Sequence, residues 1–77
     1  MRVQVFAALK DFFDKEFETD EKITTVVELR HALILRKPEA EKILSVCRFA
    51  VDDEFVDMNY KLKIHDIIAI IPPSSGG

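Results

Sequence analysis

Few residues of this chain have side chains suited to chemistry. The sequence holds one cysteine, Cys47, and two histidines, His31 and His65. A cysteine–histidine nucleophile needs a base beside the thiol and a cleft around both groups, and 77 residues leave no second lobe to form that cleft. Cys47 stands in an apolar alternation, so we expect a small buried hydrophobic side chain rather than a reactive thiol. For both histidines we expect a surface position or a local hydrogen-bonding role.

The two glycines are more informative than these side chains. They are the last two residues, Gly76 and Gly77, although glycine normally serves turns and helix ends. Without a Cβ, both residues fit a channel that is too narrow for other residues, so a partner enzyme could take the terminal carboxylate into its active site. A frayed end is the alternative. The predicted chemistry is activation of the Gly77 carboxylate, typically as an acyl-adenylate made from ATP by a separate enzyme.

The preceding residues give this carboxylate its reach. The last six residues are Pro72, Pro73, Ser74, Ser75, Gly76 and Gly77. Fully extended, they project at most about 20 Å, and the prolines stiffen the base of the segment. A stiff base lowers the entropy lost on insertion into a partner. We therefore expect a folded body over residues 1–71 and a flexible tail over residues 72–77.

Composition excludes several classes of function. Eleven basic residues are scattered among 14 acidic ones, for a net charge of −3, which argues against nucleic acid as a partner. The longest apolar run, residues 67–71, is far shorter than the roughly 20 residues that span a bilayer. One cysteine provides neither an internal disulfide nor a pair of zinc ligands, so we expect no metal site. These features predict a cytoplasmic protein of one domain.

The N-terminal half predicts two strands and two helices. Apolar alternation predicts a strand over 2–6, and helical spacing then predicts a short helix over 7–14. A looser, acidic alternation predicts an edge strand over 16–23. Thr25, with Glu28 three residues later, forms a capping box that starts the main helix. We expect this helix to end near Lys37.

The C-terminal half predicts the rest of a sheet. A short helix over 39–45 precedes a strand over 47–51. Asp52 and Asp53 then predict a turn, so this strand pairs in a hairpin with 55–56. The β-branched run 67–71 predicts a last strand that is buried on both faces. As the most apolar strands, the first and last are expected to be neighbours in the sheet centre. The main helix must bury its apolar stripe on the sheet, which predicts an α+β fold of the β-grasp, ubiquitin-like type: a mixed sheet packed on one main helix.

Four segments resemble the MoaD family, the small sulfur-carrier subunits of molybdopterin synthase. They are Val3-Gln4-Val5-Phe6-Ala7, Thr25-Val26-Val27-Glu28-Leu29-Arg30, Phe49-Ala50-Val51-Asp52 and Ile70-Ile71-Pro72-Pro73-Ser74-Ser75-Gly76-Gly77. The Pro-Pro-x-x-Gly-Gly end is the most specific of them. Two positions depart from the family: Asp52 replaces a usual Asn, and His65-Asp66 replaces a common Gly-Asp turn. Both departures concern turn geometry rather than the tail.

The resemblance implies a function and its partners. A ubiquitin-activating-type adenylyltransferase would adenylate Gly77, and a sulfur donor would convert it to a thiocarboxylate. The tail would then enter the large synthase subunit and give its sulfur to cyclic pyranopterin monophosphate. The chain would bind no cofactor, would be non-catalytic alone, and would form a heterotetramer of two small and two large subunits. Phe6, Phe55 and Ile71 would dock both partner proteins, with packing in the core as the alternative.

Other carriers of the same fold share the Gly-Gly mechanism. One is the ThiS-type carrier of thiamine thiazole synthesis, and another is a carrier for tRNA thiolation. The Pro-Pro base and the extra helical segment favour the molybdopterin pathway. A non-catalytic, ubiquitin-like interaction module is an alternative from a different class.

Overall fold

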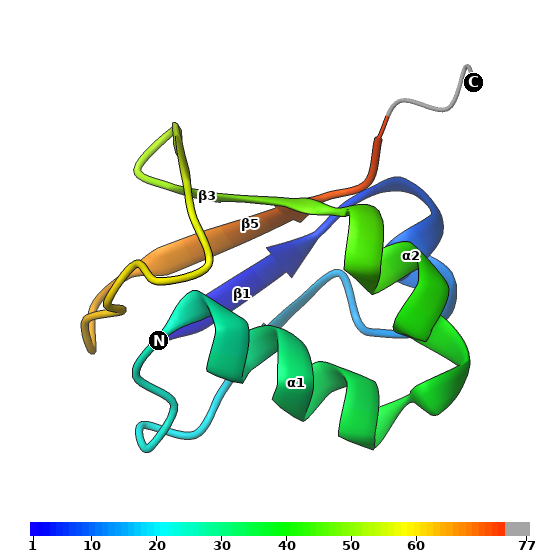
Figure 1. Cartoon of the computed structure of the whole chain (residues 1–77), viewed down its shortest axis with the longest axis horizontal. Helices are drawn as coiled ribbons and strands as arrows, with labels where there is room; N and C mark the ends of the chain where they lie inside the picture. Colours follow the sequence, from blue (N-terminus) through cyan, green and yellow to red (C-terminus); the bar gives the residue numbers. More distant parts are fainter. Residues whose placement is uncertain (74–77) are drawn as a thin grey trace.

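A mixed five-stranded sheet with helices on one side makes up the structure, a computed structural model that describes residues 1–73 (Figure 1). The strands are β1 (Arg2–Val5), β2 (Glu16–Glu18), β3 (Arg48–Val51), β4 (Glu54–Val56) and β5 (Ile67–Ile71). The helices are α1 (Val26–Arg36) and α2 (Glu41–Val46), with 3-10 turns η1 (Ala7–Asp11) and η2 (Pro38–Ala40). The strand order is β2-β1-β5-β3-β4. This topology is the predicted β-grasp arrangement.

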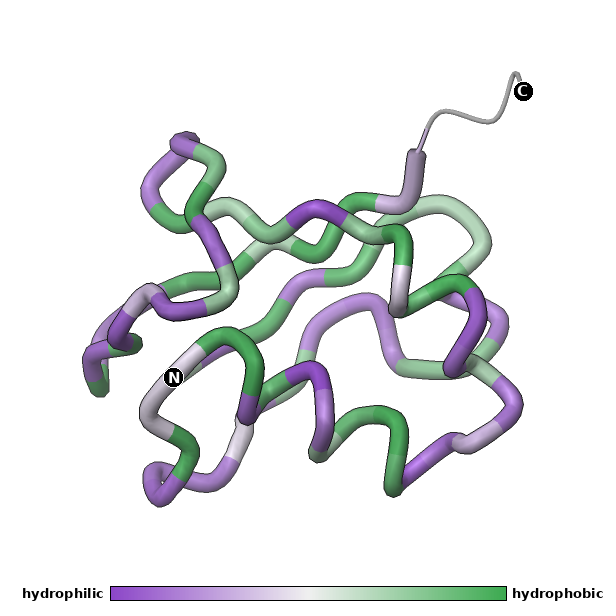
Figure 2. The backbone as a smooth tube through the Cα atoms, viewed as in Figure 1, coloured by the Kyte–Doolittle hydropathy of each residue, from purple (hydrophilic) through white to green (hydrophobic). Residues whose placement is uncertain are grey.

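The first and last strands lie side by side in the centre of the sheet, as predicted. β5 runs parallel to β1, with Val5 opposite Ile70, and antiparallel to β3, with Phe49 opposite Ile70. Side chains alternate between the two faces of a strand, so these registers set which residues face the helices. Hydrophobic residues run through the strands and helices, and hydrophilic residues are frequent in the loops (Figure 2).

The core lies between the inner face of the sheet and the two helices. The apolar stripe predicted for α1 comprises Val26, Leu29, Ala32 and Leu33. Three of these residues are buried, whereas Ala32 is half-buried. Leu44 of α2 is also fully buried and belongs to the same cluster. Burial of each such side chain contributes about 1.5–3 kcal/mol to folding. Among the described residues, no polar or charged residue is buried, so this core depends on apolar packing alone.

The start of α1 confirms the predicted cap, with one change. The Thr25 hydroxyl accepts a hydrogen bond from the Glu28 backbone N–H at 3.2 Å. The Glu28 carboxylate accepts hydrogen bonds from the backbone N–H and the hydroxyl of Thr24, at 2.8 and 2.9 Å. These bonds stabilise the charged form and lower the pKa of Glu28. The carboxylate therefore reaches one residue further back than a capping box requires.

The short elements differ in extent from the prediction. The helix expected over 7–14 is the 3-10 turn η1, and the helix expected over 39–45 is divided into η2 and α2. Ala7 has a φ of 54°, and the Leu9 N–H donates to the carbonyl of Phe6 three residues back, so η1 begins as a tight turn. The edge strand expected over 16–23 is limited to β2, because the chain turns at Asp20, whose carboxylate accepts the Lys22 N–H.

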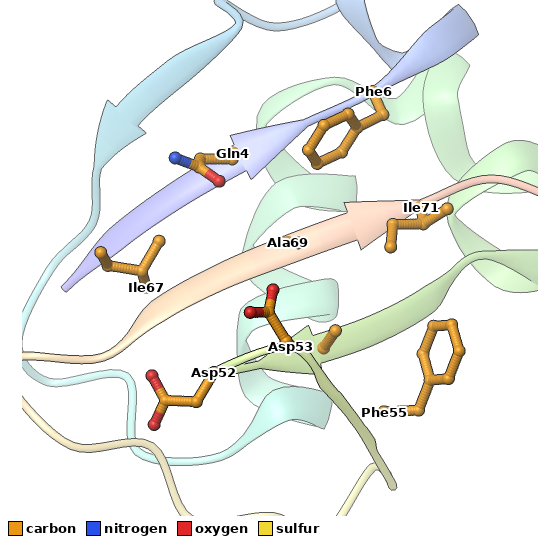
Figure 3. Close-up of a pocket in the computed structure, with 9 residues that line it drawn as sticks. Gln4, Phe6, Asp52, Asp53, Phe55, Ile67, Ala69 and Ile71 are labelled. Atoms are coloured by element: carbon orange, nitrogen blue, oxygen red, sulfur yellow. The ribbon is translucent and has the colours of Figure 1, made fainter.

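The prediction that the last strand is buried on both faces is wrong. Ile68 and Ile70 are fully buried, whereas Ile67 is 47% exposed. The helices cover only one face of the sheet, and the outer face of β5 has no covering layer among residues 1–73 (Figure 3). A β-branched run is compatible with burial of one face or of both, so its composition alone does not distinguish them.

The β3–β4 hairpin has an unusual turn. Val51 pairs with Glu54, which leaves Asp52 and Asp53 as a two-residue loop. Their φ angles are 53° and 65°, as in a type I′ turn, where Asn-Gly is the preferred pair. A residue with a Cβ costs about 1 kcal/mol in this left-handed conformation. The hairpin therefore keeps two adjacent carboxylates at a cost in stability.

Replacement of Asp53 tests this cost. We expect Asp53→Gly to raise the free energy of unfolding by about 1 kcal/mol, because glycine adopts the left-handed conformation without steric conflict. Asp53→Ala removes the same charge but keeps a Cβ, so it should bring no such gain. Urea unfolding followed by circular dichroism measures both variants. Equal stability of the glycine and alanine variants would contradict the strain argument.

Candidate functional site

The outer face of the sheet carries a shallow hollow of about 470 Å³ (Figure 3). The alternation that buries one set of strand residues points the other set outward from this face. Its lining comes from four strands and the hairpin turn: Gln4, Phe6, Ala50, Asp52, Asp53, Phe55, Ile67, Ala69 and Ile71. The small Ala50 and Ala69, which pair across β3 and β5, form its floor between larger side chains. We call this surface the outer face.

The three residues predicted to dock partners lie together on the outer face. Phe6 is 43% exposed, Phe55 is 55% exposed and Ile71 is half-buried. The register that places Val5 opposite Ile70 brings Phe6 level with Ile71. Figure 3 shows all three side chains around the end of β5, where the chain leaves the sheet. Packing in the core, the alternative for these residues, does not hold for the two phenylalanines.

Arg48 holds one of these side chains in place. Its guanidinium lies over the Phe55 ring, with its carbon 3.8 Å from the ring centroid. Such a cation–π contact contributes about 0.5–1 kcal/mol at an exposed site. Arg48 pairs with Ile71 across β3 and β5, so this cation lies at the same end of the outer face. The contact restricts Phe55 before any partner binds, which lowers the entropy cost of docking.

A second charged group on the same sheet surface is neutralised internally. Arg2 donates to Glu16 at 2.6 Å and to Glu18 at 3.1 Å. The hydrogen bond to Glu18 and the nearby charge of Glu16 raise the pKa of Arg2. Because these charges satisfy one another across β1 and β2, this corner offers little unpaired charge to a partner.

The base of the tail is anchored to the folded body. β5 ends at Ile71. Pro72 is buried and Pro73 is exposed, so the body holds the first proline of the predicted tail. The remaining predicted tail residues, Ser74, Ser75, Gly76 and Gly77, lie outside the described residues. The direction of the chain at Pro72 is therefore set next to the outer face.

The side chains singled out for possible chemistry lie apart from the outer face. Cys47 is 8% exposed, its Sγ–H donates to the Ile43 carbonyl at 3.1 Å, and burial raises the pKa of the thiol from 9.0 to about 11. His31 and His65 are exposed, as predicted. Among residues 1–73, no three His, Cys, Asp or Glu side chains gather in a group that could hold a metal ion. Nor does this part of the chain contain a helix long and apolar enough to cross a membrane.

Sequence reasoning missed most of the outer face. Gln4, Ile67 and Ala69 line the hollow, yet none of them was singled out. The available signal was the two-residue period: residues 67, 69 and 71 must share a face with one another. Their juxtaposition with Phe6 and Phe55 required the register of three strand pairs.

Fold and site together define a small β-grasp protein of the ubiquitin-like class, with an open apolar sheet face beside the origin of its C-terminal segment. The model of the ThiS family matches residues 3–77, and the chain belongs to this family. The relationship to sulfur carriers of the MoaD type that the sequence indicated is thereby confirmed.

One relative and two solved structures are informative. A molybdopterin synthase sulfur carrier subunit of Dictyostelium discoideum is 29% identical over 85 residues, covering 99% of this chain and 94% of the relative. A solved complex of subunits 1 and 2 of molybdopterin-converting factor from Helicobacter pylori contains a chain that is 31% identical, with a TM-score of 0.71 and coverage of 99% and 96%. SAMP1 of Haloferax volcanii has a TM-score of 0.80 at 21% identity, with coverage of 99% and 97%, and shows the fold alone.

The buried thiol leads to a prediction about reactivity. At pH 8, a pKa near 11 lowers the thiolate fraction of Cys47 about a hundredfold relative to a thiol of pKa 9.0. We therefore expect alkylation by iodoacetamide to be at least that much slower in the folded protein than in urea, where Cys47 is exposed. Mass spectrometry of timed samples measures both rates. Fast alkylation of the folded chain would show that the thiol is accessible and reactive.

Proposed function

We propose that this chain is the sulfur-carrier subunit of molybdopterin synthase. The observation that carries the proposal is the position of the exposed apolar outer face at the point where the chain leaves β5 toward its Gly-Gly end. A face of this kind suits a protein partner, because exposed aromatic side chains are frequent anchors of interfaces. The names of the Dictyostelium and Helicobacter relatives support this pathway.

The proposed chemistry takes place at the Gly77 carboxylate. A carboxylate is a poor acyl donor, so an adenylyltransferase of the ubiquitin-activating type first joins it to AMP from ATP and releases pyrophosphate. A sulfur donor then displaces AMP and leaves a thiocarboxylate on Gly77. In the large synthase subunit, this sulfur passes to cyclic pyranopterin monophosphate. Two such transfers build the dithiolene of molybdopterin, and the large subunit supplies the catalytic side chains.

The geometry of the body supports separate roles for the docking surface and the terminal carboxylate. The five residues after Pro72 span at most about 17 Å when extended. This length lets a terminal group enter a neighbouring active site while Phe6, Phe55 and Ile71 remain against the partner surface. Since buried Pro72 fixes the start of the segment, less freedom is lost on insertion than for a tail that begins in solvent.

A carrier for thiamine thiazole synthesis is the second candidate. The match to the ThiS family model favours it, and its chemistry at Gly77 is the same. The two candidates differ in the acceptor protein. Co-purification with a molybdopterin synthase large subunit, rather than with a thiazole synthase, would decide for the proposed function.

Removal of Gly77 tests the carrier function. We expect the shortened chain to unfold at the same urea concentration as the full chain but to form no thiocarboxylate, because the reacting carboxylate is displaced by one residue. Mass spectrometry after incubation with ATP, a sulfur source and the activating enzyme detects the exchange of one oxygen for sulfur. Full sulfur transfer by the shortened chain would refute the proposal and would favour an interaction module.

Phe55→Ala tests the docking role of the outer face. Loss of an aromatic anchor costs about 2 kcal/mol of binding, which raises the Kd for the large subunit about 30-fold. The matched control is Leu35→Ala on α1, because Leu35 is 69% exposed but lies on the helix side of the sheet. The control should leave the Kd unchanged. Isothermal titration calorimetry measures the Kd of both variants. Equal changes in Kd would show that the outer face does not dock the large subunit.

A further inference from the structure

The outer face is electrically polarised along its strands. Arg48 is level with Ile71 at the end where the tail begins. Asp52 and Asp53 follow Val51, which is level with Ile68 near the opposite end. Asp52 follows Arg48 by four positions along the strand direction, a distance of roughly 13 Å. This distance exceeds the Debye length of about 8 Å at physiological salt, so the two ends act as separate electrostatic points.

In the part of the chain that the structure describes, no ion pair involves the two carboxylates at the far end. Within residues 1–73, the ion pairs involve only Glu16 and Glu18, with Arg2 and the N-terminal amine. Both aspartates line the hollow beside its apolar residues. They also occupy left-handed backbone positions, where Asn or Gly would be more favourable. The fold therefore provides no compensation for these adjacent charges, which remain available to a partner.

We propose that Asp52 and Asp53 set the orientation of the docked carrier by pairing with Lys or Arg side chains of its protein partner. The proposal rests on the proposed function and specifies the surface that fits this chain. That surface is an apolar patch with basic residues on the side away from the channel that receives the tail. Charge complementarity favours a partner with basic residues at this position, because the acidic end of the outer face would repel an acidic surface.

An orientation signal is needed because apolar contact alone is weakly directional. The hydrophobic effect depends on the area removed from water and does not distinguish two rotated poses of similar area. A tail of limited reach delivers its terminus in only one of those poses. A charge pair at the end of the outer face remote from the tail discriminates between them and also steers the encounter.

Neutralisation of both aspartates tests the inference. The variant is Asp52→Asn with Asp53→Asn, which keeps side-chain size and suits the left-handed backbone. The matched control is Glu39→Gln with Glu41→Gln, which changes the net charge equally but on exposed residues of the helix layer. Stopped-flow measurements with the purified large subunit give the association rate constant over a series of salt concentrations.

We expect the Asp52/Asp53 variant to associate about fivefold more slowly at low salt, with a weaker dependence on salt than the wild type. The Glu39/Glu41 variant should retain the wild-type rate and salt dependence. Equal behaviour of both variants, with wild-type binding intact, would overturn the inference and leave the proposed function standing. Absence of wild-type binding to the large subunit would refute both. The free wild-type chain could instead form a dimer that is lost in the Asp52/Asp53 variant. A second copy of the chain would then be the partner of this surface, and the inference would be overturned.

Discussion

One-sided burial of the sheet is the constraint on which the rest of the structure depends. Two helices in a chain of this length cover one face, and the buried side chains of β1 and β5 pack against α1. Because successive side chains of a strand point to opposite faces, the neighbours of each core residue lie on the opposite face of the sheet. Phe6, Ala69 and Ile71 are outward for this reason. The outer face is thus a geometric consequence of how the core is formed.

Local signals in the sequence predicted most of the fold, and non-local geometry accounts for what they missed. The cap at Thr25, the stripe of α1 and the Asp52-Asp53 turn are each defined within a few residues, and all are present. β2 ends before the turn at Asp20, and η1 begins at the left-handed Ala7. The periodicity of the sequence reveals neither boundary. The prediction that β5 is buried on both faces was wrong, because burial of a strand face depends on which elements cover the sheet and not on the composition of the strand.

The candidate site combines two parts that the sequence revealed in different ways. The composition of the last residues drew attention to Gly77, and a family resemblance drew attention to Phe6, Phe55 and Ile71. Neither signal related the two parts in space. The sheet register does so, since it gathers those three side chains where β5 ends and Pro72 is buried. Gln4, Ile67 and Ala69 were not predicted to line the hollow, because their place in it depends on the strand pairing.

The burial of Cys47 has a consequence for a protein proposed to carry an activated terminus. An acyl-adenylate reacts readily with thiolates, and a free thiol on the carrier would compete with the sulfur donor for it. The only cysteine of the sequence is enclosed by the core, hydrogen-bonded to Ile43 and protonated at neutral pH. Under the proposed function, the Cys47 thiol would therefore not compete with the sulfur donor for the activated terminus.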